Sequence, residues 1–362
     1  MNLTATNKYL ADLPSMVKKV ENIRKAEVRD FTLNDYIKDT LGTTVETFYE
    51  DLGVNPAIDT LENLFTSPNE AVRWLIPEIF RSAISLGLKT GPMYPDMIIG
   101  EESIKQPTIT MPYINQADAV MKKVGEAETI ELGTMSYGSK TVKVYKVGRG
   151  IKIPYEVRQF CSLNVVGIFL QDMGLKMGKA LDGLMIDTLV NGDQPNGSES
   201  APTVGVAAPS SIAYADLLKA WVRGMRLGRG YRAIITGETE MLNILNLAEF
   251  KTKVLGAPLV NLNLKSPIPT TADLYVHGRV AAHQAILVDA SKALLKLNAL
   301  QLMVESEKIV SNQTEATYAT LTTGFANVFR DGRMIIDESL NINAAAYPSY
   351  MDPDTVENIA LY

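Results

Sequence analysis

The feature that most constrains this fold is a strand-like run followed by a long helix between Thr141 and Val190. Residues 141–154 are rich in β-branched and alternating apolar positions, which predicts a strand. Residues 164–190 predict a helix, because Asn164 is a good N-cap and Asn191-Gly192 is a natural stop. At 1.5 Å per residue this helix is about 40 Å long. The chain must therefore be organised around a strand that leads into a helical rod.

The composition of the helix predicts how it packs. Its charges recur every three to five residues and predict one solvated stripe, with Asp172 and Lys176 in the favourable acid-first order: Asp172, Lys176, Lys179, Asp182 and Asp187. The remaining positions are largely apolar and are expected to be packed along most of its length: Val166, Phe169, Leu170, Met173, Met177, Ala180, Leu181 and Leu184.

The length and charge of the chain limit the class of protein. With 362 residues it is expected to form two domains or one elaborated domain. Its formal net charge of −6 disfavours direct binding of duplex nucleic acid, which needs a basic excess. The single Cys161 indicates a reducing compartment. The N-terminus lacks signal-peptide features and no apolar run is long enough to span a membrane, so we expect a soluble protein made in the cytoplasm.

The N-terminal region divides into two parts. Residues 1–60 mix short helical signals with both charges and predict a solvated arm with little core of its own. Ser67–Glu70 then reads as a capping box before an amphipathic helix, which Pro77 should kink and Gly87 should end. The apolar face of this helix has the i, i+3, i+4 spacing: Val72, Leu75, Ile76, Ile79, Phe80, Ala83 and Ile84.

A predicted strand at Thr108–Ile114 precedes a polar insert with two legs of opposite charge. One leg is acidic and the other basic, with Gly133–Gly138 as the expected turn, which predicts a long two-stranded ribbon. An isolated hairpin is only marginally stable, so the ribbon should rest on another subunit. Its candidate inter-subunit contact residues are Glu126, Glu128, Glu131, Lys140, Lys143, Lys146 and Arg149.

The second half of the chain has an α/β pattern. Residues 191–211 predict a loop that crosses between domains. Between 212 and 310, the expected elements alternate as helix 213–228, strand 232–236, helix 238–247, strand 274–277 and strand 285–289. Strands at 317–329 and 333–337 flank Asp331-Gly332, a strong hairpin signal. The tail, with Pro348 and Pro353, is expected to be irregular.

No convincing catalytic, cofactor or metal site emerges from the residue patterns. Gly133–Thr141 comes within one residue of a phosphate-binding loop, but Ser139 intervenes and a strand follows instead of a helix. His277 and His283 are spaced wrongly for a metal pair and are expected to be structural. Cys161 is expected in the core. The basic cluster is expected to be a solvated or interface surface: Arg223, Arg226, Arg229 and Arg232.

The order of these elements resembles that of the major capsid proteins of tailed bacteriophages. Val124–Glu128 and Tyr137–Glu156 look like the family's extended E-loop and the strand that leads into its spine helix. The Ala180–Gly192 segment, ending in Asn-Gly, is similar to the end of that helix. Ile286–Leu294 and Gly324–Gly332 resemble later axial-domain and closing peripheral-domain strands. The resemblance covers residues 108–337 and depends on order and spacing together.

The resemblance implies an α+β phage major capsid fold. Its expected parts are an N-terminal arm with helices (1–100), a peripheral-domain strand (101–115), an E-loop β-ribbon (116–150), a peripheral domain with β sheet and spine helix (151–211), an axial α/β domain (212–312), and closing strands with a C-terminal tail (313–362). It further implies a shell protein that assembles with itself through pentamers and hexamers into an icosahedral virion capsid in the bacterial cytoplasm. That shell would enclose DNA without sequence-specific binding.

Several alternatives and partners accompany this resemblance. Portal, scaffold or decoration proteins of the same phage are the other expected partners. No motif singles out Lys122, Lys123 or Lys140, so no covalent crosslink is expected. An encapsulin-type nanocompartment shell is the closest alternative, because it has the same fold. A different class, an α/β enzyme domain at 212–310 on an oligomerisation platform, is disfavoured because no nucleophile–base pair or glycine-rich cofactor fingerprint is present.

Overall fold

The computed structural model describes residues 9, 12–27, 31–67, 70–106, 108–114, 126, 135–193, 200–247 and 272–354. The chain forms two compact units, each assembled from three separate segments. The first unit contains Met1–Pro92, Tyr145–Leu181 and Asn298–Thr323, and the second contains Met93–Val144, Asp182–Leu297 and Gly324–Tyr362. In the described ranges, no helix is both long and apolar enough to cross a bilayer.

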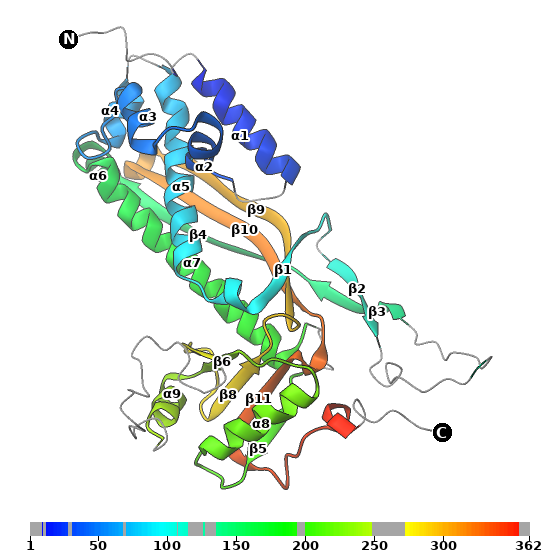
Figure 1. Cartoon of the computed structure of the whole chain (residues 1–362). Helices are drawn as coiled ribbons and strands as arrows, with labels where there is room; N and C mark the ends of the chain where they lie inside the picture. The colour runs from blue at the N-terminus through cyan, green and yellow to red at the C-terminus, as the bar shows by residue number, and fades with distance from the viewer. Residues whose placement is uncertain are drawn as a thin grey trace. The chain divides into compact units, whose positions relative to one another are not determined.

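Helices dominate the N-terminal part of the first unit (Figure 1). They are α1 (Leu13–Glu27), α2 (Leu33–Tyr36), η1 (Ile37–Leu41), α3 (Val45–Asp51), α4 (Leu61–Thr66), η2 (Glu70–Trp74) and α5 (Leu75–Thr90). Thr32 starts α2 with a capping box to Asp35, and the Thr44 and Thr60 side chains cap α3 and α4.

The N-terminal helices have a core, so the expected solvated arm is wrong. Leu13, Val20, Leu33, Ile37 and Phe48 are each at most 1% exposed. Each helix is short and of mixed charge, and its apolar residues are few. Their burial depends on several helices packing together, which a reading of one segment at a time does not predict.

Helix α5 also differs from the sequence prediction at Pro77 and Gly87. A 3-10 turn precedes Leu75, so Pro77 lies in the first turn of α5, where its missing N–H is not required. The helix continues past Gly87 to Thr90. A Cβ at Gly87 would overlap the carbonyl oxygen of Gln171. This glycine therefore allows close helix packing instead of ending the helix.

The predicted long helix is confirmed as α7 (Leu163–Asn191), which extends one residue beyond the prediction at each end. Asn164 is not its cap. The N–H groups of Leu163 and Asn164 donate to the carbonyls of Asp59 and Pro56 at 2.9 and 3.1 Å. Carbonyl groups distant in sequence thus accept hydrogen bonds from the free N–H groups at the start of this helix. Gly192 takes the left-handed conformation beyond its end, with φ of 84°.

The solvated stripe of α7 is only partly as predicted. Asp172 and Lys176 form the expected exposed ion pair at 2.5 Å. Asp182 is 3% exposed, so its place in that stripe is wrong. Phe169, expected to be packed, is 61% exposed, because the first turns of α7 carry apolar residues on their outer face.

One sheet has four strands in the order β1-β9-β10-β4. Their bounds are β1 (Ile98–Ser103), β4 (Tyr145–Pro154), β9 (Leu294–Ile309) and β10 (Thr314–Asn327). Strands β4 and β10 pair antiparallel, from Tyr145 opposite Thr323 to Pro154 opposite Thr314. The short helix α6 (Tyr155–Phe160) connects β4 to the start of α7.

The ribbon pairs differently from the prediction. Strand β2 (Thr108–Ile114) pairs antiparallel with β3 (Met135–Lys143). The expected turn at Gly133–Gly138 is wrong from residue 135 onward, because Met135–Gly138 belong to β3. The basic leg is divided between two sheets, since β4 pairs with β10. Strand β3 takes the predicted 108–114 strand as its partner.

The second unit contains a five-stranded sheet in the order β5-β11-β8-β6-β7. Its strands are β5 (Thr203–Val206), β6 (Ala233–Thr236), β7 (Asp273–Val276), β8 (Gln284–Val288) and β11 (Arg333–Asn341), with helices α8 (Tyr214–Arg226) and α9 (Glu238–Leu245). The predicted helices and strands between 213 and 289 are confirmed. The predicted loop at 191–211 is wrong where β5 forms, because β5 gains a parallel partner in β11.

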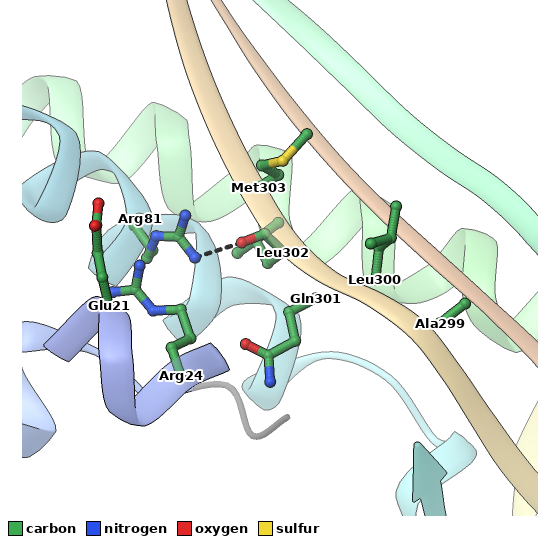
Figure 2. A pocket seen from close by; sticks show the side chains of 8 residues that line it. All are labelled: Glu21, Arg24, Arg81, Ala299, Leu300, Gln301, Leu302 and Met303. Atoms are coloured by element: carbon green, nitrogen blue, oxygen red, sulfur yellow. Dashed lines mark hydrogen bonds between the residues drawn. The ribbon is translucent and has the colours of Figure 1, made fainter. Parts of the chain in front are cut away.

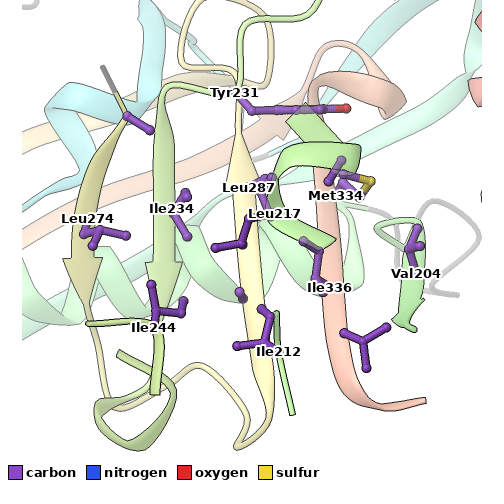
Figure 3. Close-up of a cluster of buried hydrophobic side chains, with 14 of the residues drawn as sticks. Val204, Ile212, Leu217, Tyr231, Ile234, Ile244, Leu274, Leu287, Met334 and Ile336 are labelled. Atoms are coloured by element: carbon purple, nitrogen blue, oxygen red, sulfur yellow. The ribbon is translucent and has the colours of Figure 1, made fainter. Parts of the chain in front are cut away.

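A hydrophobic core joins this sheet to its helices (Figure 3). Leu217 of α8 and Ile244 of α9 lie with side chains from the strands, among them Ile234, Leu287 and Ile336. All five are at most 3% exposed. This burial of apolar surface is the main source of stability for the unit.

The predicted hairpin at Asp331-Gly332 is wrong. Strand β10 pairs with β4, whereas β11 pairs with β5 and β8 in the other sheet. The turn is fixed by tertiary contacts: Asp331 accepts from Arg229 Nε at 2.8 Å, and its carbonyl accepts from the Tyr231 hydroxyl at 2.9 Å. Asp331 is 4% exposed. Contacts distant in sequence therefore direct the two strands into different sheets.

Candidate contact surfaces

A row of exposed basic side chains follows the end of β3 and the edge strand β4. Lys143, Lys146, Arg149 and Lys152 are all exposed. Because side chains alternate along a strand, Lys146 and Lys152 lie on one face of β4 and Arg149 on the other. Charged residues at a sheet edge also oppose uncontrolled pairing with other strands. The basic residues of β4 therefore protect the edge of the four-stranded sheet.

The predicted acidic leg is not brought to these residues in the described part of the chain. Glu126 is an exposed turn residue, and Glu128 and Glu131 lie outside the described residues. In the ribbon, Lys140 is opposite Met111 and Lys143 is opposite Thr108. On β4, Lys146 is opposite Thr322 and Arg149 is opposite Ala319. The described strands thus set no acidic residue directly opposite these four basic ones.

An exposed apolar patch lies where α6 leads into α7, and the sequence reading missed it. Phe160, Ile168 and Phe169 are 77%, 64% and 61% exposed, and Val165 is 41% exposed. Residues 165, 168 and 169 share one face of α7 by their helical spacing. Exposed large apolar side chains gathered on one helix face are typical of a protein contact surface. The missed signal is this second apolar stripe at the start of α7.

A groove of about 700 Å³ adjoins this patch in the first unit. Helices α3, α5 and α7 contribute to its wall through Tyr49, Leu86 and Ile168, and Gly167 leaves its surroundings open. Glu46 and Glu50 give it acidic character. This composition suits an apolar segment with basic flanks.

A second pocket, of about 410 Å³, is lined by α1, α5 and β9 (Figure 2). Arg24 donates to both carboxylate oxygens of Glu78 at 2.9 and 3.1 Å and to the Phe31 carbonyl at 3.0 Å. Arg81 donates to the Leu302 carbonyl. All three side chains are largely buried. Since these donors already serve protein acceptors, the cluster is a joint between α1, α5 and β9.

Another buried cluster, in the second unit, contains two acidic side chains. Glu240 on α9 and Glu338 on β11 are 2% and 3% exposed. The Glu338 carboxylate contacts His283 Nδ1, and Asn243 donates to Glu240 at 3.3 Å. Burial raises the pKa of the Glu240 carboxyl, and the charge of Glu338 adds to the increase. The contact with Glu338 raises the pKa of His283.

The remaining chemically suggestive residues take structural positions. His277 Nδ1 accepts from the Arg279 N–H at 3.1 Å, and Cys161 is half-buried at the end of α6. Arg223, Arg226 and Arg229 hold nearby segments of the chain instead of forming one open basic face. Across the described ranges, no three histidine, cysteine or acidic residues are arranged to hold a metal ion.

Comparison with known proteins gives one sequence match. A family model described as "Phage capsid protein" matches residues 137–327, just over half of the chain. The matched region begins in β3 and ends with β10, so it includes β4 and all of α7. No curated protein sequence matches.

Solved structures that are similar to this chain include a virus-like particle and phage proteins. The virus-like particle of Pyrococcus furiosus is 11% identical with a TM-score of 0.48, covering 71% of this chain and 97% of that one. A Microbacterium phage Oxtober96 chain is 14% identical with a TM-score of 0.48, covering 68% and 91%. A Mycobacterium phage Adephagia chain is 11% identical with a TM-score of 0.47, covering 68% and 90%.

Proposed function

Because the chain belongs to the phage capsid protein family, we propose that it is the major shell-building protein of a tailed-phage head. The family membership makes it a structural protein of a capsid shell. The observation that carries the proposal is the extent of the match, which includes the ribbon strand β3, the long helix α7 and strands of both sheets. Its role is to form contacts with copies of itself, and no reaction is assigned to it.

Two different exposed surfaces support head-to-tail contact between copies. One is the basic row on β3 and β4, and the other is the apolar patch at Phe160, Ile168 and Phe169 with its acidic groove. Contacts between unlike surfaces are heterologous and close into rings when the rotation permits. We propose that the rings are the pentamers and hexamers of an icosahedral shell. The proposed contact residues between copies are those of the E-loop: Glu126, Glu128, Glu131, Lys140, Lys143, Lys146 and Arg149.

The charge of the chain supports a shell that encloses double-stranded DNA without gripping it. A net charge of −6 leaves no overall attraction for phosphates. Assembly in the bacterial cytoplasm, with portal, scaffold or decoration proteins as partners, completes the proposal. The encapsulin-type shell remains the alternative, and the contents of the particle distinguish the two.

Negative-stain electron microscopy with light scattering of the purified full-length protein tests this function. Closed shells, or rings of five and six copies, are the expected result. Shells from infected or expressing cells should contain DNA or be empty, whereas particles filled with one protein would favour a nanocompartment. A monomer or dimer at high concentration, with no particles after changes in salt or crowding, would contradict a shell-building role.

A further inference from the structure

The groove between α3, α5 and α7 in the first unit has apolar walls and an acidic rim. Leu86 of α5 and Ile168 of α7 line it and are 51% and 64% exposed, so much of their apolar surface faces water. Among the described residues of its lining, the charged side chains are Glu46 and Glu50, and both are exposed. Exposed apolar side chains rimmed by polar ones are typical of a surface that a partner covers.

The two acidic side chains of the rim repel each other. Glu46 and Glu50 are four residues apart on α3, so they share one face of this helix, and like charges at this spacing destabilise a helix. In the part of the chain that the structure describes, neither carboxylate takes part in an ion pair or hydrogen bond. A cationic group from another molecule would relieve this repulsion.

The edge strand β4, in the same unit, has the complementary pattern. Tyr145, Val147 and Arg149 share one face of β4, because side chains alternate along a strand. Tyr145 is 54% exposed and Arg149 is exposed. Among the described residues, the Arg149 side chain has no ion-pair or hydrogen-bond partner. This face therefore presents an apolar ring and, about 13 Å further along the strand, a guanidinium that is free to bind an acid.

The charges of the two surfaces decide how copies of the chain can meet. Two grooves facing each other would bring the carboxylates of Glu46 and Glu50 from both copies together, which opposes a symmetric contact. A groove facing β4 instead sets Arg149 against these carboxylates and Tyr145 against apolar walls. Such a contact joins unlike surfaces, so it can be repeated from copy to copy around a ring.

We propose that the edge strand β4 of one copy lies in the groove of the next. The Tyr145 ring packs against Leu86 and Ile168, and the Arg149 guanidinium binds Glu46 and Glu50. Tyrosine and arginine are the side chains that most often dominate the binding energy of an interface. A guanidinium has five N–H donors and can serve two carboxylates at once. This inference rests on the proposed shell-building function and names the residues of one of its contacts.

Charge reversal with rescue in the full-length chain tests the pairing. Glu46→Lys with Glu50→Lys, or Arg149→Glu alone, should raise the protein concentration needed for assembly at least tenfold, because like charges then meet. The three substitutions together should return this threshold to within about threefold of wild type. The matched control replaces Arg149→Glu by Lys152→Glu, on the other face of β4, and should not rescue. Light scattering across a dilution series measures each threshold. No rescue by Arg149→Glu, or equal rescue by Lys152→Glu, would overturn the proposal.

Disulfide trapping separates this contact from shell formation. In a Cys161→Ser background, a Tyr145→Cys protein is mixed with a differently tagged Leu86→Cys protein, and non-reducing gels follow the mixed disulfide. It should form at least tenfold faster than with Tyr318→Cys, which replaces a tyrosine of β10 that is 41% exposed.

The outcomes of the trapping experiment distinguish the contact from the function. Fast mixed disulfides without shells in the electron microscope would support the contact and contradict the shell-building role. Shells with equal trapping rates for Tyr145→Cys and Tyr318→Cys would overturn the contact alone. Bonds that form fastest between two Leu86→Cys copies would also overturn it, by assigning the groove to a symmetric contact.

Discussion

The Asp182 carboxylate accepts a hydrogen bond from the backbone N–H of Tyr94 at 2.9 Å, although Asp182 lies well inside a helix of 29 residues. The same carboxylate accepts from the Met93 N–H at 3.0 and 3.1 Å. Asp182 is 3% exposed, so these bonds are shielded from water. A charged group in this position holds the turn that leads into β1.

Asp182→Ala should therefore destabilise the second unit by about 3 kcal/mol, because it removes charge-assisted hydrogen bonds and leaves two buried N–H groups unsatisfied. Urea unfolding followed by circular dichroism measures the change. The matched control is Asp187→Ala. Asp187 lies on the same helix as Asp182, and the substitution removes its exposed ion pair with Arg279. That variant should unfold close to the wild-type midpoint. Equal losses in both variants would contradict a special role for Asp182.

Three glycines provide a second test, in the first unit. A Cβ at Gly87 would overlap the Gln171 carbonyl, and one at Gly174 would overlap the Ile84 carbonyl. Gly87→Ala and Gly174→Ala should each destabilise by about 2 kcal/mol or more through overpacking. Gly167 has open space around it, so Gly167→Ala should be neutral or stabilise by up to about 1 kcal/mol. Thermal unfolding of the three variants decides whether this ranking holds.

The buried acidic cluster predicts a pH dependence. The pKa values of Glu240 and His283 are both raised in the folded protein, so their stabilising protonated forms are present at low pH and are lost as pH rises. Burial opposes ionisation of Asp337, but hydrogen bonds from Ser339 and Gln284 lower its pKa, so it titrates below this range.

We therefore expect the urea midpoint of the second unit to fall as pH rises from 4.5, the ordinary pKa of a glutamate carboxyl, to 6.5, that of a histidine, and to continue falling above it. Glu240→Gln, which imitates the protonated side chain, should weaken this dependence. Glu238→Gln on the exposed start of α9 is the control and should leave it unchanged. A flat profile for the wild-type protein between these pH values would show that the cluster does not titrate there.

Charge reversal tests the basic row. The triple variant Lys140→Glu, Lys143→Glu and Lys146→Glu should block shell assembly while leaving circular dichroism unchanged, because an acidic partner surface would then be repelled. Lys18→Glu, Lys19→Glu and Lys179→Glu change the net charge equally at other exposed positions and should assemble. Electron microscopy of both proteins is the measurement. Normal shells from the first variant would show that these ribbon residues are not part of the contact surface.

The apolar patch gives an independent assembly test. Phe160→Ser with Phe169→Ser removes two side chains that are more than half exposed, so the stability of the folded monomer should change little. If these residues contact a second copy, assembly should require at least tenfold higher protein concentration. Light scattering across a dilution series measures this threshold. An unchanged threshold would leave the patch outside the interface.

Local patterns were sufficient to predict α7, α8 and α9 and strands β6 and β8. Each has a cap, a stop or an apolar run within its own sequence. The predicted ribbon failed because β-pairing is decided between segments: β3 selects β2, and β4 selects β10. Asp331-Gly332 failed as a hairpin for the same reason, since Arg229 and Tyr231 hold the turn from another part of the chain.

The contact surfaces were predicted only in part. Basic residues at 143, 146 and 149 were selected by charge, and the structure shows them exposed. Phe160 and Phe169 were not selected, because an apolar residue on a helix is normally expected in the core. Their exposure depends on which face of α7 is covered by α5, and that is a property of tertiary packing. Asp182 was wrongly predicted to be exposed, because a charged residue on a helix is normally expected at the surface.

The glycine contacts of α5 and α7 also limit how the first unit can move. The two helices lie side by side, and at Gly87 and Gly174 the backbone of each meets the other with no side chain between them (Figure 1). A slide of one residue along the axis would bring a neighbouring side chain against a main-chain carbonyl. Helices α5 and α7 can therefore pack in only one axial register. Bending within the first unit must take place away from this contact.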